Sequence, residues 1–307
     1  MPKMHIEKSV KIEKPVAEVY NLLNNFDNWT AWSPWLITDP DAKVTVAEDK
    51  KFYEWTGPVT GDGQMKIYGE KENERIDIDL TFLKPWKSTA KVWFDVRTEG
   101  SGTRVKWGMD SKLPFFIFFM KNMMESMIGM DYDRGLSMLK EFAETGKVSS
   151  ELDIVGKTKF AGGKYVGIKS STSIDKMGES MERDFTKLLE HVKGKHAEAV
   201  AGNAFSIYHK WDPVKKQAEY TAAIPVNSKV ELLSGMFEGE YPETDMFTIH
   251  HKGKYEYAGN PWSAAWGRKQ AKIIKANKKL HPIEEYLNSP KDTDPDKLET
   301  RVHMAIK

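Results

Sequence analysis

A glutamate near the end of the chain is the strongest candidate for binding or acid–base chemistry. The stretch PIEEYL is expected to be a strand, and its alternation puts Glu284 and Tyr286 on one face. Ile283 and Leu287, on the other face, need the side that helices cover. A carboxylate among aromatic rings attracts a cation, and the ring faces add cation–π contacts. The alternative is a solvated glutamate on an exposed sheet edge.

The face of Glu284 is expected to collect further polar side chains from two other strands. In TRVHMAI the apolar residues take the helix side, which leaves Arg301 and His303 beside Glu284. In FSIYHKW the same alternation leaves Tyr208 on that face. Partial burial would raise the pKa of the glutamate unless a cation compensates. A catalytic hypothesis follows, with Glu284 as the general base and Tyr208 or Tyr286 as the acid.

These strands belong to an internal repeat in residues 149–307. Each unit runs strand, helix, strand, strand, with helices expected over 173–193 and 260–277. The first unit has the strands GGKYVGIKS, AFSIYHKW and AEYTAAIPV, and the second has MFTIHHKG, PIEEYL and TRVHMAI. Neither unit can bury its sheet face alone, so the two are expected to pair about a pseudo-twofold axis.

Residues 152–307 resemble the gyrase-inhibitor-like family, the effector-binding domain of AraC-type and multidrug-responsive regulators. The resemblance is carried, in chain order, by YVGIK, YHKWDP, IPV, HKGKYEYAGNPW and EEYLNSP. It implies a ligand between the two repeats, on the sheet face away from the helices, where a glutamate of the EEYL strand contacts cationic aromatic compounds. Some relatives hydrolyse strained electrophiles with that glutamate and a tyrosine.

Two features of the second half bear on this resemblance. Arg301 stands where many relatives have an acidic or neutral residue. From the neighbouring strand it would neutralise Glu284 and weaken a preference for cations. Trp262 and Trp266, four residues apart on the second helix, either pack in the core or contact the ligand, and Trp262 is the candidate contact.

The first half of the chain begins with a strand and two short helices, and the second helix carries an aromatic stretch. This stretch, NFDNWTAWSPW, holds Trp29, Trp32 and Trp35. Their separations of three and six residues spread the rings around a helix, so all three are not expected to face one ligand. Six antiparallel strands follow, and a long helix over about residues 115–145 is the element able to cover the apolar sheet face.

Residues 1–146 resemble the START-like, polyketide-cyclase-like helix-grip superfamily (SRPBCC). The resemblance rests on the order of elements, on WTAWSPW followed by Asp39-Pro40, and on RGLSMLKEF near the end of the last helix. It implies an apolar cavity enclosed by the sheet and the long helix.

Four residues are candidate contacts of a ligand in that cavity. By the resemblance, Trp32, Trp107 and Met109 point inward, and methionines of the long helix such as Met123 lie opposite. Methionine adapts to irregular space and to varied ligands. The alternative is that these side chains only pack against one another.

Composition and motifs exclude several classes of protein. The 307 residues carry 46 basic and 45 acidic side chains, a net charge of +1, so direct binding of nucleic acid is not expected. There is no cysteine, and no histidine pair has metal-ligand spacing, so no metal and no cofactor are expected. The apolar run LPFFIFFM (113–120) is too short for a membrane span, which needs about 20 residues. We expect a core helix there, and a membrane-surface role stays open.

These patterns predict an α+β chain of two domains. Residues 1–148 would form a helix-grip antiparallel sheet wrapping a long C-terminal helix, and residues 149–307 a second α+β domain of two strand-helix-strand-strand repeats. The leading hypothesis is a cytoplasmic protein that senses or sequesters a hydrophobic or aromatic, in one version cationic, small molecule. It would lack its own DNA-binding domain, although the second resemblance links it to transcription regulation. The alternatives are a hydrolase or cyclase with Glu284 as general base, and a module that docks a protein partner or a second copy.

Overall fold

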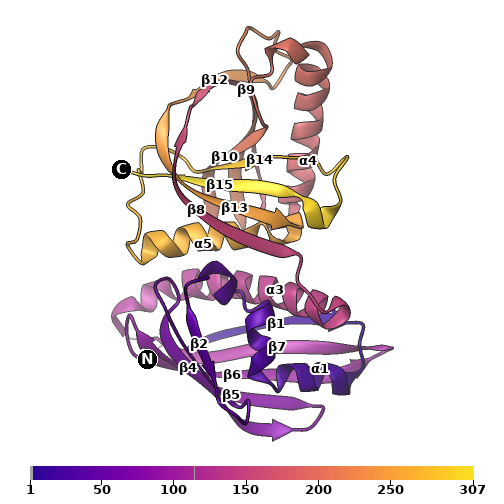
Figure 1. Cartoon of the computed structure of the whole chain (residues 1–307), viewed down its shortest axis with the longest axis vertical. Coiled ribbons are helices and arrows are strands. Elements are labelled where there is room, and N and C mark those ends of the chain that lie inside the picture. Colours follow the sequence, from indigo (N-terminus) through magenta and orange to yellow (C-terminus); the bar gives the residue numbers. More distant parts are fainter. Residues whose placement is uncertain (1–2, 114) are drawn as a thin grey trace. The chain divides into compact units, whose positions relative to one another are not determined.

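The computed structural model describes residues 3–113 and 115–307 and divides into two compact units, Met1–Ser149 and Ser150–Lys307. Each unit contains one antiparallel sheet, so the chain is α+β with two sheets and one long helix (Figure 1). Pro114, inside the apolar run 113–120, lies outside the described residues, as do the first two residues of the chain.

The seven strands of the first unit form one sheet in the order β1-β7-β6-β5-β4-β3-β2. The strands are β1 (Lys3–Ile12), β2 (Lys43–Val46), β3 (Phe52–Gly57), β4 (Gly61–Lys71), β5 (Arg75–Lys84), β6 (Ser88–Glu99) and β7 (Gly102–Lys112). The helices are α1 (Val16–Leu23), α2 (Trp29–Trp32) and α3 (Lys121–Thr145), with short 3-10 helices η1 (Phe26–Asn28), η2 (Leu36–Thr38) and η3 (Phe115–Met120). Lys3 of β1 pairs with Lys112 of β7, so the chain leaves the sheet toward α3 at the end where β1 begins.

The long helix α3 packs on the sheet through a close contact with β7. The ring of Tyr132 stacks on the ring of Trp107, with centroids 3.8 Å apart and an interplanar angle of 15°. A Cβ at Gly135 would come within 2.9 Å of the Trp107 ring and 3.0 Å of Pro34, so only glycine allows this approach. The helix ends at Gly146, whose φ of 81° is the left-handed conformation that glycine adopts readily.

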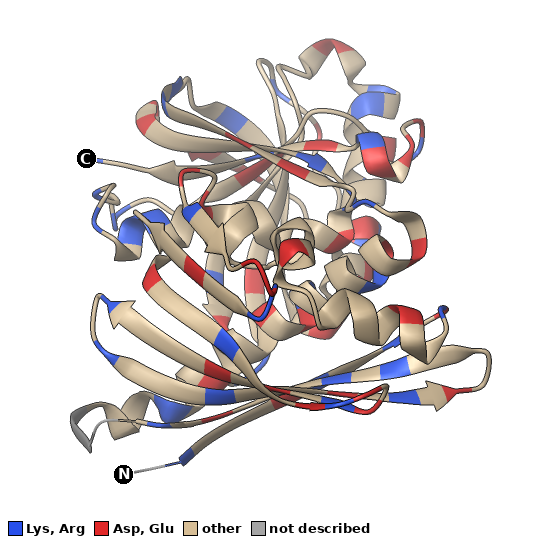
Figure 2. Ribbon diagram, turned by 60° about the horizontal axis from the view of Figure 1, so that its bottom comes forward, with Lys and Arg blue, Asp and Glu red and all other residues tan. Residues whose placement is uncertain are grey.

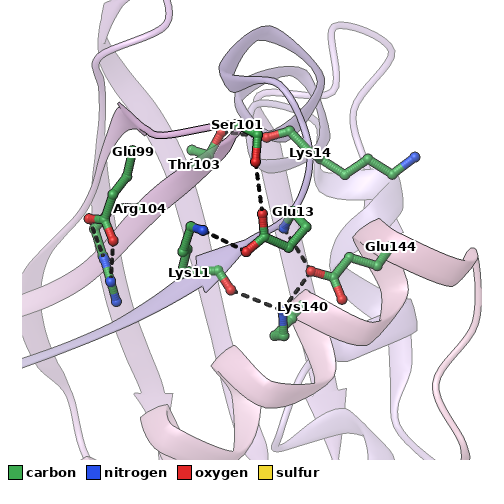
Figure 3. A network of polar contacts seen from close by, with 9 residues as sticks. All are labelled: Lys11, Glu13, Lys14, Glu99, Ser101, Thr103, Arg104, Lys140 and Glu144. Atoms are coloured by element: carbon green, nitrogen blue, oxygen red, sulfur yellow. Dashed lines mark hydrogen bonds and ion pairs between the residues drawn. The ribbon is translucent and has the colours of Figure 1, made fainter.

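A polar network holds the last turn of α3 against the far end of β1 (Figure 3). The backbone N–H of Glu13 donates to Glu144 Oε1 at 2.7 Å, and Lys140 Nζ donates to the Lys11 carbonyl at 3.1 Å. Lys140 Nζ also pairs with Glu144 at 2.6 Å, and Lys11 pairs with Glu13 at 2.7 Å. This end of the first unit is therefore closed by charged and hydrogen-bonded groups.

The eight strands of the second unit form one sheet in the order β12-β9-β11-β10-β14-β15-β13-β8. The strands are β8 (Ser150–Phe160), β9 (Gly163–Ser173), β10 (Phe205–Asp212), β11 (Gln217–Pro225), β12 (Phe237–Tyr241), β13 (Thr244–Gly253), β14 (Ile283–Tyr286) and β15 (Glu299–Ala305). The helices are α4 (Met177–Leu188) and α5 (Gly259–Gln270), with the short elements η4 (Ile174–Lys176), η5 (Leu189–Lys193), η6 (Ala197–Ala199), η7 (Tyr255–Tyr257) and η8 (Pro295–Lys297). Strands β10 and β14 occupy the centre of the sheet.

Both faces of this second sheet are buried over much of their area. On one face α4 packs with β9 and β11 through residues such as Leu188 and Ile224, and α5 packs with β13 and β15 through residues such as Ala264 and Val302. The opposite face has its own apolar core, which contains Ile283. Neither α4 nor α5 contributes a residue to this core. Successive side chains of the central strands therefore point into two buried cores, one on each face, rather than into a core and solvent in turn.

Some element boundaries differ from the sequence-based expectations. The second helix of the repeat was expected over 260–277, but α5 ends at Gln270 and Lys272 adopts a φ of 60°, which an α-helix cannot contain. Strands β8 and β12, at the two edges of the sheet, were not expected. Edge strands are specified by their pairing partners more than by their own alternation, which weakens their sequence signal.

Charged residues of both signs are interspersed along the strands and helices of both units (Figure 2). On the first sheet they form ion pairs between neighbouring strands, such as Arg75 with Asp95 at 2.7 Å and Lys106 with Glu7 at 3.0 Å. Within the described residues, no helix combines the length and apolar character that crossing a bilayer requires.

Candidate ligand-binding site

Glu284 lies at the centre of the second sheet, and its carboxyl group is buried. The residue is 3% exposed, although a glutamate is rarely buried without a charged partner. The Tyr208 hydroxyl, from the neighbouring strand β10, donates to Glu284 Oε2 at 2.6 Å. The indole N–H of Trp262, from α5, reaches the same oxygen at 3.4 Å. One strand and one helix therefore converge on a single carboxylate oxygen.

Aromatic rings surround this carboxyl group. Tyr208 and Trp262 meet edge to face with centroids 4.6 Å apart. Tyr286, two residues along β14, contacts Phe185 of α4 at 5.3 Å and Tyr255 of η7 at 6.1 Å. Its hydroxyl donates to Ser206 Oγ at 3.0 Å. We call Tyr208, Trp262, Tyr286, Tyr255 and Phe185 the aromatic cage; its rings are half-buried or exposed, whereas Glu284 beneath them is buried.

The electrostatics of the site disfavour the charged form of the carboxyl group. Burial raises the pKa of Glu284, and hydrogen bonds from Tyr208, Trp262 and Tyr286 offset only part of this effect. Burial and the nearby carboxylate raise the pKa of Tyr208 well above its ordinary value. Among the described residues, no lysine, arginine or histidine forms an ion pair with Glu284. The site holds an acidic group without a protein countercharge.

The expected face of Glu284 was wrong. Alternation correctly placed Glu284, Tyr286 and Tyr208 together, but on the side away from the helices. The contacts with Trp262 of α5 and Phe185 of α4 put this cluster on the helix side, and Ile283 lies in the opposite core. The reason is that both faces are apolar, so alternation separates two sets of side chains without saying which set faces the helices.

Arg301 and His303 do not accompany Glu284, which corrects a second expectation. In the β14–β15 register, Glu284 pairs with Val302, and Glu285 pairs with Arg301. Arg301 lies 3.8 Å from Glu285 Oε2, and His303 Nε2 lies 3.3 Å from the same oxygen. Both residues therefore belong to the face of Glu285, and Arg301 does not neutralise Glu284.

In the first unit, the predicted inward residues form a packed aromatic cluster. Trp32 and Trp107 are both buried, with ring centroids 5.7 Å apart, and Met109 is buried on the same strand as Trp107. Met123 differs, because it is 40% exposed near the start of α3. The structure thus gathers three of the four candidates in the interior and leaves the fourth at the surface.

The three tryptophans of the stretch NFDNWTAWSPW converge on one ring, Trp107, although their spacing predicted that they would not all face one ligand. Trp29, Trp32 and Trp35 each contact Trp107, with centroids 5.6, 5.7 and 5.8 Å away. The helical-wheel argument did not apply to Trp35, because α2 spans four residues and the chain turns at Ser33. Tyr132, which stacks on Trp107, was not predicted. The sequence of the long helix does not indicate that this tyrosine is on the buried face rather than the exposed one.

Two polar atoms in this cluster lack partners. The indole nitrogens Nε1 of Trp32 and Trp107 are buried and have no hydrogen-bond acceptor within the described part of the chain. A buried indole N–H usually finds a partner, because leaving it unpaired costs about 1–3 kcal/mol. The cluster therefore contains two unused donors in an otherwise apolar environment.

Sequence reasoning missed two members of the cage in the second unit. Tyr255 lies in the stretch HKGKYEYAGNPW and Phe185 lies in the helix expected over 173–193, and the pattern of neither segment points to the site. Both reach the site through tertiary contacts with Tyr286. Among the described residues, no group of three or more histidine, aspartate or glutamate side chains could hold a metal ion.

Solved structures with a similar arrangement each resemble one part of the chain. Protein CV1439 from Chromobacterium violaceum is 13% identical, with a TM-score of 0.36, over 46% of this chain and 96% of its own. The Aha1 dimer from Colwellia psychrerythraea is 17% identical, with a TM-score of 0.36, over 47% and 98%. The EcmrR C-terminal domain is 13% identical, with a TM-score of 0.39, over 52% and 98%. At these values the likenesses carry no argument about function.

The search of curated proteins returned no match. A family model does match the first unit. Residues 3–144 are similar to the family described as polyketide cyclase / dehydrase and lipid transport.

Proposed function

We propose that the second unit binds an organic cation with an aromatic body at Glu284. The observation that carries the proposal is the buried carboxyl group, whose hydrogen bonds in the described chain come from the neutral donors of Tyr208, Trp262 and Tyr286. A bound cation would supply the missing charge. The rings of the aromatic cage would contact its body and add cation–π attraction. The chain would thereby sense or sequester such a ligand.

The arrangement of strands supports a gyrase-inhibitor-like domain in residues 149–307. Two segments of the chain run strand, helix, strand, strand: β9-α4-β10-β11 and β13-α5-β14-β15. Their strands mirror each other about the centre of the sheet, as β9-β11-β10 and β14-β15-β13. We infer two related repeats, with Glu284 near the line where they meet.

We propose a second, apolar ligand site in the first unit, as a helix-grip domain over residues 1–148. The unpaired indole nitrogens of Trp32 and Trp107 favour it, because a lipophilic ligand with a carbonyl or hydroxyl group would accept a hydrogen bond from them. Met109 would contact the apolar part of the ligand, and Met123 would lie toward its outer end. Quenching of tryptophan emission by lipophilic ketones tests this site, and a Trp32→Phe variant should weaken the quenching.

A matched pair of probes tests the cation site. Phenyltrimethylammonium and tert-butylbenzene have nearly the same shape and differ in charge. Isothermal titration calorimetry of the full chain should show binding of the cation and much weaker binding of the neutral compound. Larger aromatic cations, screened by thermal shift, should bind more tightly because they contact more of the cage.

Glu284→Gln and Glu285→Gln make a matched pair of variants. The two glutamates are neighbours on β14 but face opposite sides of the sheet. Glu284→Gln should abolish the preference for the cation, whereas Glu285→Gln should leave it unchanged. Equal binding of the two probes by the unaltered chain, or equal effects of the two substitutions, would contradict the proposal.

The hydrogen bond between Tyr208 and Glu284 favours a second candidate function, general acid–base catalysis on a hydrophobic substrate. Burial moves the pKa of Glu284 upward, toward the range in which a carboxylate is an efficient base near neutral pH. Turnover of a substrate found by screening should then fall by about 10²–10⁴-fold in Glu284→Gln. Turnover that survives this change while cation binding is lost would leave only the binding function.

A further inference from the structure

Two connections of the first unit lie at the same end of its sheet. Ala90 near the start of β6 pairs with Ser111 near the end of β7, and Ser111 Oγ donates to the Thr89 carbonyl at 3.0 Å. The β5–β6 connection, which contains Trp86, therefore lies beside the point where β7 leads into η3. This is the end opposite the polar network of Figure 3.

Large apolar side chains are exposed at this end on both connections. Phe119 is 72% exposed and Phe118 is 53% exposed in η3, and Trp86 is 58% exposed between β5 and β6. Leu83 and Met120 beside them are also exposed. The apolar run 113–120 was expected to be a core helix, but its last residues lie at the surface. Several large apolar side chains exposed at one end of a sheet are typical of an interaction surface.

Three lysines at the same end of the sheet have no ion-pair partner among the described residues. Lys87 follows Trp86, and Lys112 ends β7. Lys3 lies opposite Lys112 on the neighbouring strand β1. None of the three forms an ion pair within the described chain. Lys84, the last residue of β5, pairs with Asp62 at 2.6 Å. Uncompensated lysines around exposed phenylalanine and tryptophan match the two layers of a bilayer surface, which are anionic headgroups and the acyl boundary.

We propose that this end of the first unit docks on the surface of an anionic lipid bilayer. Phe118, Phe119 and Trp86 enter the boundary between headgroups and acyl chains, and Lys3, Lys87 and Lys112 contact lipid phosphates and carboxylates. Tryptophan suits this depth because its ring is apolar and its N–H is polar. Charge complementarity selects a bilayer over an apolar protein groove, since a groove would leave the lysines without partners.

Vesicle flotation of the full chain tests the proposal. Vesicles of phosphatidylcholine mixed with phosphatidylserine should carry the protein, and phosphatidylcholine vesicles should carry at least about tenfold less, because each lysine near an anionic surface contributes about fivefold. High salt should release the bound protein. A double Phe118→Ser, Phe119→Ser variant should lose at least about tenfold of the binding.

The matched control is Trp211→Ser, which replaces a tryptophan of the second unit that is 45% exposed. It should bind vesicles like the unaltered chain. All variants should keep the melting temperature, since the side chains are at the surface. The proposal is overturned if the unaltered chain does not float with anionic vesicles. It is also overturned if the Phe118→Ser, Phe119→Ser variant and the Trp211→Ser variant bind anionic vesicles equally. It is also overturned if sedimentation equilibrium shows that Phe118 and Phe119 hold two copies of the chain together.

Discussion

Raising the pH should tighten the binding of an organic cation to the Glu284 site. Burial raises the pKa of Glu284, and the described chain supplies no countercharge. The cation binds the ionised carboxylate, so binding releases a proton from the fraction that is protonated. Below the raised pKa, affinity should increase about tenfold per pH unit and then reach a plateau.

The affinity reached at the plateau follows from the charge of Glu284. A cation about 5 Å from the carboxylate gains about 3 kcal/mol at an effective dielectric constant of about 20, which is about two orders of magnitude in affinity. Glu284→Gln keeps the shape of the side chain but removes this charge. Its affinity should therefore lie about a hundredfold below the plateau and should not change with pH.

Calorimetric titrations from about pH 5 to about pH 8, in buffers of different ionisation enthalpy, measure both quantities. The dependence of the observed enthalpy on the buffer gives the number of protons released. Without ligand the sign is reversed: the raised pKa favours the folded state at low pH, and this contribution is lost as pH rises through the raised pKa. Affinity that is flat with pH, or that increases on acidification, would refute the reasoning.

Three further predictions concern single side chains. Tyr208→Phe keeps the ring but removes the donor to Glu284 Oε2; the pKa of Glu284 should rise further, and cation affinity at neutral pH should fall several-fold in a fluorescence titration. His251 is fully buried, and burial lowers its pKa to about 4; its contribution of about 3 kcal/mol is present above about pH 6.5 and lost as pH falls toward 4, so His251→Gln should flatten the acid side of the stability profile in urea denaturation. Trp107→Ala removes the ring on which five other aromatic side chains converge; it should destabilise the first unit by about 3–5 kcal/mol in urea denaturation followed by near-ultraviolet circular dichroism, and a loss under about 1 kcal/mol would show that the cluster is not packed as described.

Much of the candidate site could be predicted from alternation along short strands. Period two in FSIYHKW and PIEEYL placed Tyr208, Glu284 and Tyr286 on a shared face before any tertiary contact was known. Phe185 and Tyr255 could not be added in the same way. They lie on a helix and a short 3-10 element, and only the packing of those elements on the sheet brings them to Tyr286.

The partners of Arg301 and His303 depend on which face of β14 each glutamate occupies, and local sequence patterns specify this weakly here. Arg301 and His303 were correctly placed on one face of their strand, but they meet Glu285 rather than Glu284. A reversal of one face changes the partner of every side chain on it. The tryptophans of the first unit show a similar limit, because the turn at Ser33 redirects Trp35 toward Trp107 in a way that helical spacing does not describe.

The sequence by itself determined the order of most elements, apart from β8 and β12, and the sets of side chains that share a strand face, because hydrophobic periodicity is a local property. Only the tertiary structure decided which set faces the helices. Both faces of the second sheet are buried, so the apolar set and the aromatic set each have an interior to occupy. Helices α4 and α5 pack on the same face of the sheet and flank its central strands. Their contacts place the aromatic set, with Glu284 beneath it, on the helix side.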